Sequence, residues 1–272
     1  MDGKALAERL RAEIAAEVRQ IDDVGLATVL VGDDPASDVY IRRKHEAAKE
    51  VGIRSIDHRL PAETTQEELE RLVAGLSADD SVDGILIQSP LPAQLDEEAA
   101  VRRLHPGKDV DGFHPENAAR LYFGDPLFVP ATPLGVLALL REYEVPLEGA
   151  RAVVVGRSLI VGKPMSLLLL GANATVTVAH SRTTDLGALT READVLVVAV
   201  GQTGVVTAEM VKPGAAVVDV GMNRTDDGLR GDVDPAAAEN AGLITPVPGG
   251  VGPMTIASLL RNTVEAARRR RC

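Results

Sequence analysis

Cysteine and tryptophan are the residues that this sequence most nearly lacks. Its 272 residues include one cysteine, Cys272, and no tryptophan. A single cysteine forms no intrachain disulfide and assembles no cysteine-based metal site. This composition is typical of a reducing compartment, so we expect a cytoplasmic protein.

Aromatic side chains and positive charge are also scarce. Aromatics make up 2% of the residues, and the formal net charge at pH 7 is −11. Proteins that bind nucleic acids usually offer a basic surface for phosphates and aromatic rings on which bases stack. We therefore expect no nucleic-acid partner. The terminal run of four arginines, residues 268–271, is predicted to be a solvated helix end that complements the helix dipole.

No apolar run approaches the roughly 18 to 20 residues of a membrane-spanning helix. The first 21 residues predict an amphipathic helix that contains acidic side chains, which is unlike a secretory signal or a transit peptide. The five histidines show no HxxxH or similar spacing, which favours surface or core positions over metal ligation. We therefore expect neither a membrane partner nor a metal site.

Short β-branched runs alternate with helical patterns along the whole sequence. This alternation predicts an α/β fold with parallel sheets, and the length favours two domains. A boundary is expected within residues 122–136, which contain three prolines and two glycines. The expected strands are residues 26–32, 53–60, 83–88, 151–156, 174–179, 194–201, 215–221 and 243–247.

Residues 151–170, "RAVVVGRSLIVGKPMSLLLL", predict a strand, a turn opened by Gly156 and a helix that begins near Gly162 or Pro164. Such a junction directs backbone N–H groups and the positive end of a helix dipole toward a phosphate. The spacing matches neither a P-loop nor the GxGxxG fingerprint. A plain structural turn is therefore the alternative interpretation.

The end of the following strand indicates which dinucleotide would bind. NAD-binding units carry an acidic residue there, which holds the ribose 2′-hydroxyl. This sequence has His180, Ser181 and Arg182 instead, and Arg157 follows the first glycine. A hydroxyl beside cations suits the 2′-phosphate of NADP. We predict a preference for NADP, although each arginine alone is also compatible with a plain surface charge.

The segment "PASDVYIRRKHEAAKEVGI", residues 35–53, predicts a helix with one special lysine. Helical spacing places Tyr40, Lys44, Ala47 and Val51 on one stripe, so Lys44 is predicted to lie on the inward side. Partial burial would lower its pKa and make a neutral amine available as a general base. The alternative is a lysine that merely extends along apolar surface.

Further polar residues follow the expected strands of the first half. Gln88 ends a strand before a proline-rich loop, and Asp109 and Asp111 lie two residues apart. Ligands of open parallel sheets collect at the carboxyl ends of strands, whereas isolated aspartates before glycine also form turns. A loop with three prolines and three glycines, residues 245–255, would allow close approach of backbone to a flat ligand or serve as a connection.

These segments, in this order, resemble the bifunctional methylenetetrahydrofolate dehydrogenase/methenyltetrahydrofolate cyclohydrolase family. The resemblance covers about residues 27–265. It rests on "SDVYIRRK", "DGILIQSPLP", "KDVDGFHPEN", "PATPLGVLALL", "VVVGRSLIVGKPM", "GDVD" and "ITPVPGGVGPMTIASLL". It implies two α/β lobes that flank a cleft, the second a Rossmann-type NADP domain, and a homodimer. The implied domains are a folate-binding catalytic domain, 1–130 completed by the helix 254–272, and an NADP-binding domain, 131–253.

The resemblance also implies roles for individual residues. Lys44 would carry the cyclohydrolase proton transfers, Gln88 would tune it, Tyr40 would contact the folate, and Asp111 would hold the pterin. The implied cofactor-binding residues are Gly156, Arg157, Ser158, Ser181 and Met222, to which the charge argument adds Arg182. The loop at Gly249 and Gly250 would lie beside nicotinamide and folate.

The implied activity is oxidation of 5,10-methylenetetrahydrofolate with NADP⁺, followed by hydrolysis of the methenyl product to 10-formyltetrahydrofolate. Three positions depart from the family pattern: Ser89 stands where leucine is common, Ala131 where cysteine is frequent, and Glu46 where a second lysine is common. We expect Ser89 to reshape the folate pocket and Glu46 to alter the electrostatic field at Lys44.

Three other interpretations remain open from the sequence. One is a dehydrogenase with little cyclohydrolase activity, which a hydrolysis assay without nucleotide would identify. Another is a non-catalytic module that binds dinucleotide or folate, which would give no absorbance change with both substrates. A third is an amino-acid or hydroxy-acid dehydrogenase, which leaves the YxxxK pattern of Tyr40 and Lys44 unexplained.

Overall fold

The computed structural model describes residues 1–226 and 228–271, so the lone Cys272 lies outside the described residues. The chain divides into two compact units, which we call the N-terminal unit and the central unit. The N-terminal unit comprises Glu8–Ala131 and Ile256–Cys272, and the central unit comprises Met1–Ala7 and Thr132–Thr255.

A three-stranded parallel sheet forms the centre of the N-terminal unit. Strand β1 (Gly25–Val31) pairs with β2 (Arg54–Leu60) on one side and with β3 (Gly84–Ile87) on the other. Every residue of β1 is buried, as expected for the middle strand of a parallel sheet that is covered on both faces.

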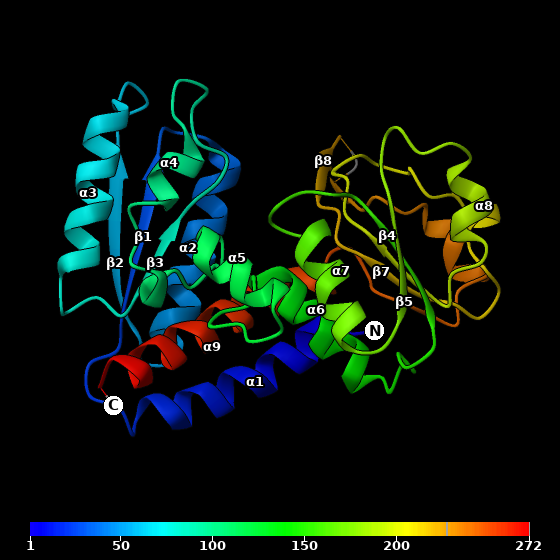
Figure 1. Ribbon diagram of the computed structural model, residues 1–272, viewed down its shortest axis with the longest axis horizontal. Helices are drawn as coiled ribbons and strands as arrows, with labels where there is room; N and C mark the ends of the chain where they lie inside the picture. Colours follow the sequence, from blue (N-terminus) through cyan, green and yellow to red (C-terminus); the bar gives the residue numbers. More distant parts are fainter. Residues whose placement is uncertain (227, 272) are drawn as a thin grey trace. The chain divides into compact units, whose positions relative to one another are not determined.

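Helices cover both faces of this sheet. Leu26 and Leu30 of β1 belong to a core that includes residues of α2 and α9, whereas Ala27 and Val29 belong to a core with α3. Figure 1 shows α3 running along one face of the strands. The helices that lie wholly or mainly in this unit are α1 (Gly3–Val18), α2 (Pro35–Glu50), α3 (Gln66–Ala78), α4 (Glu97–Val101), α5 (Pro115–Tyr122) and α9 (Val251–Arg271), and a 3₁₀ turn spans Pro106–Lys108.

Local sequence signals explain where two of these helices begin. The side chain of Asp34 accepts a hydrogen bond from the backbone N–H of Ser37, and Pro35 occupies the first turn of α2. Thr65 and Glu68 form a capping box at the start of α3. These caps fix the register of the helix that carries Lys44 and of the helix that covers the opposite face.

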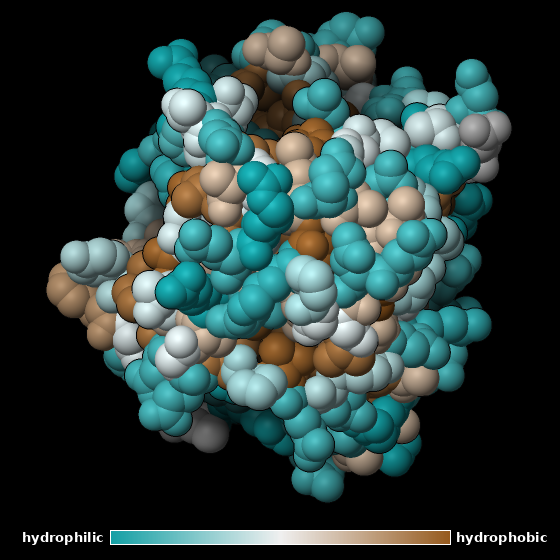
Figure 2. All heavy atoms as spheres, turned by 90° about the vertical axis from the view of Figure 1, so that its right-hand side faces the viewer, coloured by the Kyte–Doolittle hydropathy of each residue, from teal (hydrophilic) through white to brown (hydrophobic). Residues whose placement is uncertain are grey.

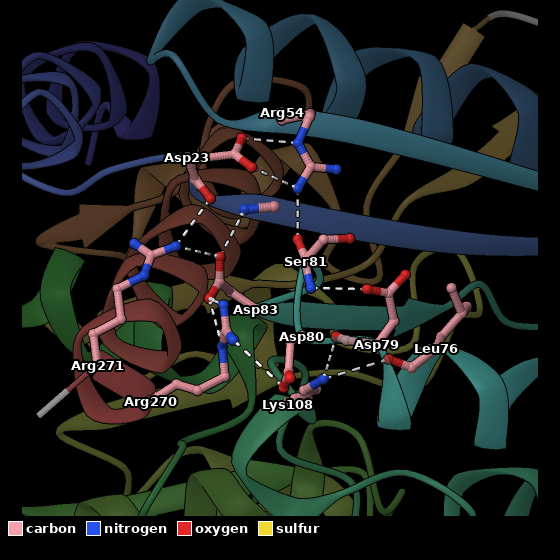
Figure 3. Close-up of polar contacts among 11 residues, drawn as sticks. Asp23, Arg54, Leu76, Asp79, Asp80, Ser81, Asp83, Lys108, Arg270 and Arg271 are labelled. Carbon is pink, nitrogen blue, oxygen red and sulfur yellow. Dashed lines mark hydrogen bonds and ion pairs between the residues drawn. The ribbon is translucent and has the colours of Figure 1, made fainter.

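The arginine-rich end of α9, residues 268–271, is exposed, as predicted, and two of its side chains also bind a buried carboxylate. Asp83 has no exposed surface, and its carboxylate accepts hydrogen bonds from the backbone of Gly25 and from Arg270, whose Nη2 lies 2.7 Å from Oδ1. Arg271 also lies 3.4 Å from Asp83, and the same edge of the sheet holds the ion pair between Asp23 and Arg54 (Figure 3). The buried carboxylate requires charged or polar partners, so it draws the helix end onto the sheet.

A five-stranded parallel sheet forms the centre of the central unit, in the order β10-β7-β6-β4-β5. Strands β4, β6 and β7 are buried over nearly their whole lengths. The strands of this sheet are β4 (Arg151–Val155), β5 (Thr175–Ala179), β6 (Val195–Val198), β7 (Ala216–Asp219) and β10 (Leu243–Ile244).

The remaining elements of the central unit are short. Its helices are α6 (Ala131–Glu142), α7 (Gly162–Gly171) and α8 (Leu186–Thr190), with 3₁₀ turns at Ala208–Met210 and Pro235–Glu239. Strands β8 (Asn223–Thr225) and β9 (Gly228–Arg230) form an antiparallel hairpin. Figure 2 shows one face of the molecule, on which hydrophobic areas lie scattered among hydrophilic side chains.

All eight expected strands are present, and the α/β class with parallel sheets is confirmed. The β8–β9 hairpin is the strand pair that the sequence pattern did not predict, because each strand has only three residues. Within residues 1–226 and 228–271, no helix is both long enough and apolar enough to cross a membrane.

Candidate active site

Helix α2 places Lys44 on its inward side, as helical spacing predicted. Ala47 and Val51, on the same stripe, are buried, and Tyr40 and Lys44 are half-buried. The neighbouring Arg43 is exposed. The structure therefore separates Lys44 from the solvated charges beside it.

Gln88 meets Lys44 at the carboxyl end of the sheet. The Nζ atom of Lys44 donates a hydrogen bond to Oε1 of Gln88 at 3.0 Å. The backbone N–H of Gln88 donates to the carbonyl of Val29, which holds the residue directly after β3. Its Nε2 donates to the carbonyl of Ser89 at 2.6 Å. Because Nε2 is used in this way, Oε1 is the amide atom that accepts from the amine.

Lys44 and Asp111 are half-buried groups of opposite charge that act on each other. Burial lowers the pKa of Lys44, and the charge of Asp111 opposes this change. Burial also raises the pKa of Asp111 to about 6; Lys44 opposes the rise, and Asp109 and Glu97 add to it. Both groups are therefore easier to neutralise than in water. Glu46, expected to influence Lys44, is exposed, and Asp111 is the charge that acts on this pKa.

The loop that carries Asp111 is held by buried polar side chains. Asp109 is 1% exposed, and its Oδ2 accepts a hydrogen bond from Nδ2 of Asn117 at 2.8 Å. Asn262 of α9 donates to the carbonyl of Val110 at 2.8 Å. The two candidate aspartates therefore differ: Asp109 satisfies donors of its own loop, whereas Asp111 is half-buried and acts on the lysine.

Glu97 is a neighbour of this group that sequence reasoning missed. The hydroxyl of Ser89 hydrogen-bonds to the carboxylate of Glu97, the first residue of α4. A chain of hydrogen bonds therefore runs from Lys44 through Gln88 and Ser89 to Glu97. Ser89, at a position where leucine is common, was the sequence feature that could have indicated a polar neighbour. Its partner Glu97 lies eight residues later, outside any local motif.

In the central unit, the junction between β4 and α7 is a tight turn. Gly156 has φ +128°, and a Cβ atom there would collide with the carbonyl oxygen of Ala199. The hydroxyl of Ser158 accepts a hydrogen bond from the backbone N–H of Val161 at 3.1 Å. Arg157 and Ser158 are exposed. The predicted strand, turn and helix are present, and the helix begins at Gly162.

The turn after β5 lies at the same edge, because β4 and β5 are parallel neighbours. His180 organises this turn: its backbone N–H donates to Thr183, and its Nδ1 accepts from the backbone N–H of Arg182. Ser181 and Arg182 are exposed. Among the described residues, no carboxylate forms an ion pair with Arg182 or with Arg157, so two uncompensated positive charges follow adjacent strands.

The remaining candidate residues lie together in the central unit. A small pocket is lined by residues 219–222, which end β7 and follow it, and by residues 246–252. These segments contain Met222, Gly249 and Gly250, which the sequence placed near one ligand. The structure thus gathers the candidates of the N-terminal unit around Lys44 and those of the central unit at two places, the turns after β4 and β5 and this pocket.

The fold and these groups define a two-unit α/β enzyme with a dinucleotide-binding sheet and a separate lysine–carboxylate site. Sequence comparisons agree. The catalytic-domain model of the tetrahydrofolate dehydrogenase/cyclohydrolase family matches residues 1–111, and the NAD(P)-binding-domain model of that family matches residues 130–271. The chain belongs to the tetrahydrofolate dehydrogenase/cyclohydrolase family.

Individual relatives cover the whole chain. The bifunctional protein FolD of Acidiphilium cryptum is 57% identical over an alignment of 274 residues, which covers 100% of this chain and 98% of the relative. The crystal structure of FolD from Campylobacter jejuni is 47% identical, with a TM-score of 0.95 over 99% of this chain and 98% of that one. The Trypanosoma brucei enzyme, solved with NADP and an inhibitor, is 40% identical, with a TM-score of 0.95 over 99% and 97%.

These comparisons confirm the expected family and the assignment as an enzyme with the catalytic domain and the NAD(P)-binding domain of that family. The interpretations as a non-catalytic module and as an amino-acid or hydroxy-acid dehydrogenase are set aside, because both family domains match in the expected order.

Proposed function

We propose that the protein oxidises 5,10-methylenetetrahydrofolate with NADP⁺ and hydrolyses the methenyl product to 10-formyltetrahydrofolate. The observation that carries this proposal is the half-buried amine of Lys44, which donates a hydrogen bond to Gln88 and lies in the field of Asp111. Burial lowers the pKa of Lys44, which makes the neutral amine easier to reach than in water, and a lysine of this kind can accept and return a proton, as the second reaction requires.

Hydrolysis requires three proton transfers and releases one proton overall. As water attacks the methenyl carbon, the neutral amine of Lys44 accepts a proton from the water and becomes an ammonium, which leaves a hydroxyl group on the carbon. The same ammonium then donates a proton to N5 of the folate as the bond between the carbon and N5 breaks. The hydroxyl proton then leaves to solvent, through the neutral amine that has been regenerated, and the formyl group remains on N10. Gln88 keeps the Nζ atom in one place through these steps by accepting a hydrogen bond in either protonation state.

Asp111 would bind the pterin ring. An ionised carboxylate accepts two hydrogen bonds from adjacent ring N–H and amino donors. Because its pKa is about 6, Asp111 is mostly ionised at pH 7 and becomes protonated in mildly acidic solution. Tyr40, one helical turn before Lys44, would contact the folate.

The central unit suits NADP by the chemistry of its donors. The tight turn at Gly156 and Ser158 would present backbone N–H groups and a hydroxyl to the diphosphate of NADP. Three exposed residues, Arg157, Ser181 and Arg182, would hold the 2′-phosphate. When bound, NADP⁺ supplies the hydride acceptor. The backbone of Met222 and the loop at Gly249 and Gly250 would border the reacting end.

Three further assignments belong to this proposal. Residues 1–130 with 254–272 form the folate-binding catalytic domain, and residues 131–253 form the NADP-binding domain. The protein acts in the cytoplasm as a homodimer. Light scattering coupled to size-exclusion chromatography tests the dimer, since a monomer mass at micromolar concentration would contradict it.

Two assays test the proposed function. Mixing 5,10-methylenetetrahydrofolate with NADP⁺ should produce the methenyl absorbance and reduced cofactor, at a rate well above that with NAD⁺. Adding methenyltetrahydrofolate without nucleotide should give accelerated loss of its absorbance. Oxidation without hydrolysis would instead favour the dehydrogenase with little cyclohydrolase activity, for which the polar contact between Ser89 and Glu97 beside the site is the supporting observation.

A further inference from the structure

Asp232 is a buried carboxylate that accepts hydrogen bonds from the backbone of the loop after β6, about 30 residues earlier in the sequence. It has no exposed surface. Its Oδ2 accepts hydrogen bonds from the backbone N–H groups of Val200 at 2.6 Å and Gly201 at 2.9 Å, and its Oδ1 accepts from Gln202 at 2.9 Å. Nδ2 of Asn223 also donates to Oδ1 at 2.9 Å. One side chain thus fixes three consecutive residues of the loop after β6 and the first residue of β8.

A second buried carboxylate, Asp219, locks Asp232 in place. Asp219 is the last residue of β7, and its Oδ1 accepts from the backbone N–H groups of Gly221 and Asp232, each at 2.9 Å. Its Oδ2 accepts from Val233 at 3.0 Å. Burial raises the pKa of Asp219, and these hydrogen bonds oppose the rise. The two acids are therefore held by N–H donors, and among the described residues neither forms an ion pair.

Two glycines permit this arrangement. A Cβ atom on Gly221 would collide with the carboxylate of Asp232, and a Cβ atom on Gly231 would collide with the carboxylate of Asp219. The motifs "VVDVGMN", residues 217–223, and "GDVD", residues 231–234, therefore form one interlocked structure. Met222, a proposed cofactor contact, directly follows the first of these glycines.

The loops fixed by Asp232 border one half of the dinucleotide edge. In a doubly wound sheet the ribose that carries the 2′ group lies over the strand that follows the first βα turn, here β5. The other half of the dinucleotide then extends over β6 and β7, on the opposite side of β4. The loop after β6 also touches the turn at Gly156, through the carbonyl of Ala199.

We propose that Asp232 is a positioning residue that shapes the loops after β6 and β7 to receive the nicotinamide half of NADP. This inference rests on the proposed function. Asp232 does not touch the cofactor; it acts through the backbone of residues 200–202 and through Asp219, which holds the segment that leads to Met222. The adenosine half would bind to the turns after β4 and β5, which, among the described residues, donate no hydrogen bond to Asp232.

The variant Asp232→Asn tests this role, because the amide replaces one accepting oxygen with an NH₂ group that faces N–H donors. Loss of a buried acceptor should raise the dissociation constant of NADP⁺ by about 10- to 100-fold. Calorimetric titration should show unchanged affinity for adenosine 2′,5′-bisphosphate, which contains only the adenosine half. Methenyl hydrolysis without nucleotide should also persist, since Lys44 lies in the other unit.

Asp234→Asn is the matched control. Asp234 is half-buried two residues later and caps the 3₁₀ turn that begins at Pro235, and asparagine preserves such a cap. If Asp232→Asn fails to fold, Asn223→Ala removes one donor to Asp232 and should weaken NADP⁺ binding by a smaller factor, about 2- to 5-fold.

Unchanged NADP⁺ affinity in Asp232→Asn, or equal loss of affinity for NADP⁺ and the bisphosphate, would overturn the inference. Failure of the wild-type protein to bind NADP⁺ would overturn the proposed function instead.

Discussion

Replacing Lys44 by methionine should remove the proton carrier of hydrolysis while it preserves the shape of helix α2. Methionine has a similar length and an apolar end, so it suits a half-buried position that packs beside Ala47. The hydrogen bond from Nζ to Gln88, 3.0 Å long, is lost with the amine. Loss of a general acid–base group typically costs about 10²- to 10⁴-fold in rate, or about 3 to 5 kcal/mol of activation free energy.

The assay is the nucleotide-free loss of methenyl absorbance, corrected for spontaneous hydrolysis. The matched control is Arg43→Met, which removes an exposed charge from the adjacent position of the same helix. Affinity for NADP⁺ should remain unchanged in both variants, since its proposed site lies in the central unit. Lys44 lowers the pKa of Asp111, so removing the amine should raise that pKa above 6. The pH below which substrate affinity declines should then also rise above 6. Hydrolysis by Lys44→Met within about threefold of wild type would refute the assignment, since acid–base groups contribute far more.

Three further variants test the electrostatics. Asp111→Asn should bind folate more weakly but should raise the free energy of unfolding at pH 7.5. The pKa of Asp111 in the folded protein, about 6, lies above its value in the unfolded chain. The stability that the protonated carboxyl contributes below pH 4 is therefore lost as the pH rises through 6. The full change in the pKa of Asp111 corresponds to about 3 kcal/mol. Thermal melts should show that the asparagine variant is ~1–2 kcal/mol more stable than wild type at pH 7.5 and equally stable at pH 4. Glu97→Gln should move the acidic limb of kcat/KM to lower pH, because Glu97 raises the pKa of Asp111; an unmoved limb contradicts this. Arg182→Ala should raise KM for NADP⁺ by about 10-fold and leave KM for NAD⁺ unchanged, as expected for a charge-assisted contact to the 2′-phosphate; equal changes with both cofactors contradict it.

Local patterns were sufficient to predict much of this protein. The eight strands follow from β-branched runs, and the inward position of Lys44 follows from helical spacing, because both depend on backbone periods of two and 3.6 residues. The turn at Gly156 was predictable for the same reason, since strand, glycine and helix are consecutive in the sequence.

Long-range polar contacts were not predictable in this way. Asp83 and Arg270 are 187 residues apart, so no local pattern could show that the exposed arginine-rich end also binds a buried carboxylate. Ser89 was a signal for Glu97 but did not identify it, and nothing local indicated the contacts of Asp232, because its partners belong to other loops and become neighbours only after the sheets form. The role of a buried acid depends on the donors around it, and these are set by the tertiary structure.

Product stoichiometry tests the central claim most directly. Purified protein would be incubated with limiting 5,10-methylenetetrahydrofolate, labelled with ¹³C at the bridging carbon, and excess NADP⁺. Mass spectrometry should find the label in 10-formyltetrahydrofolate in an amount equal to the NADPH formed, because both reactions act on the same folate. The account would be contradicted if NADPH formed while the label accumulated as methenyltetrahydrofolate, and if that compound were hydrolysed no faster than in an enzyme-free control.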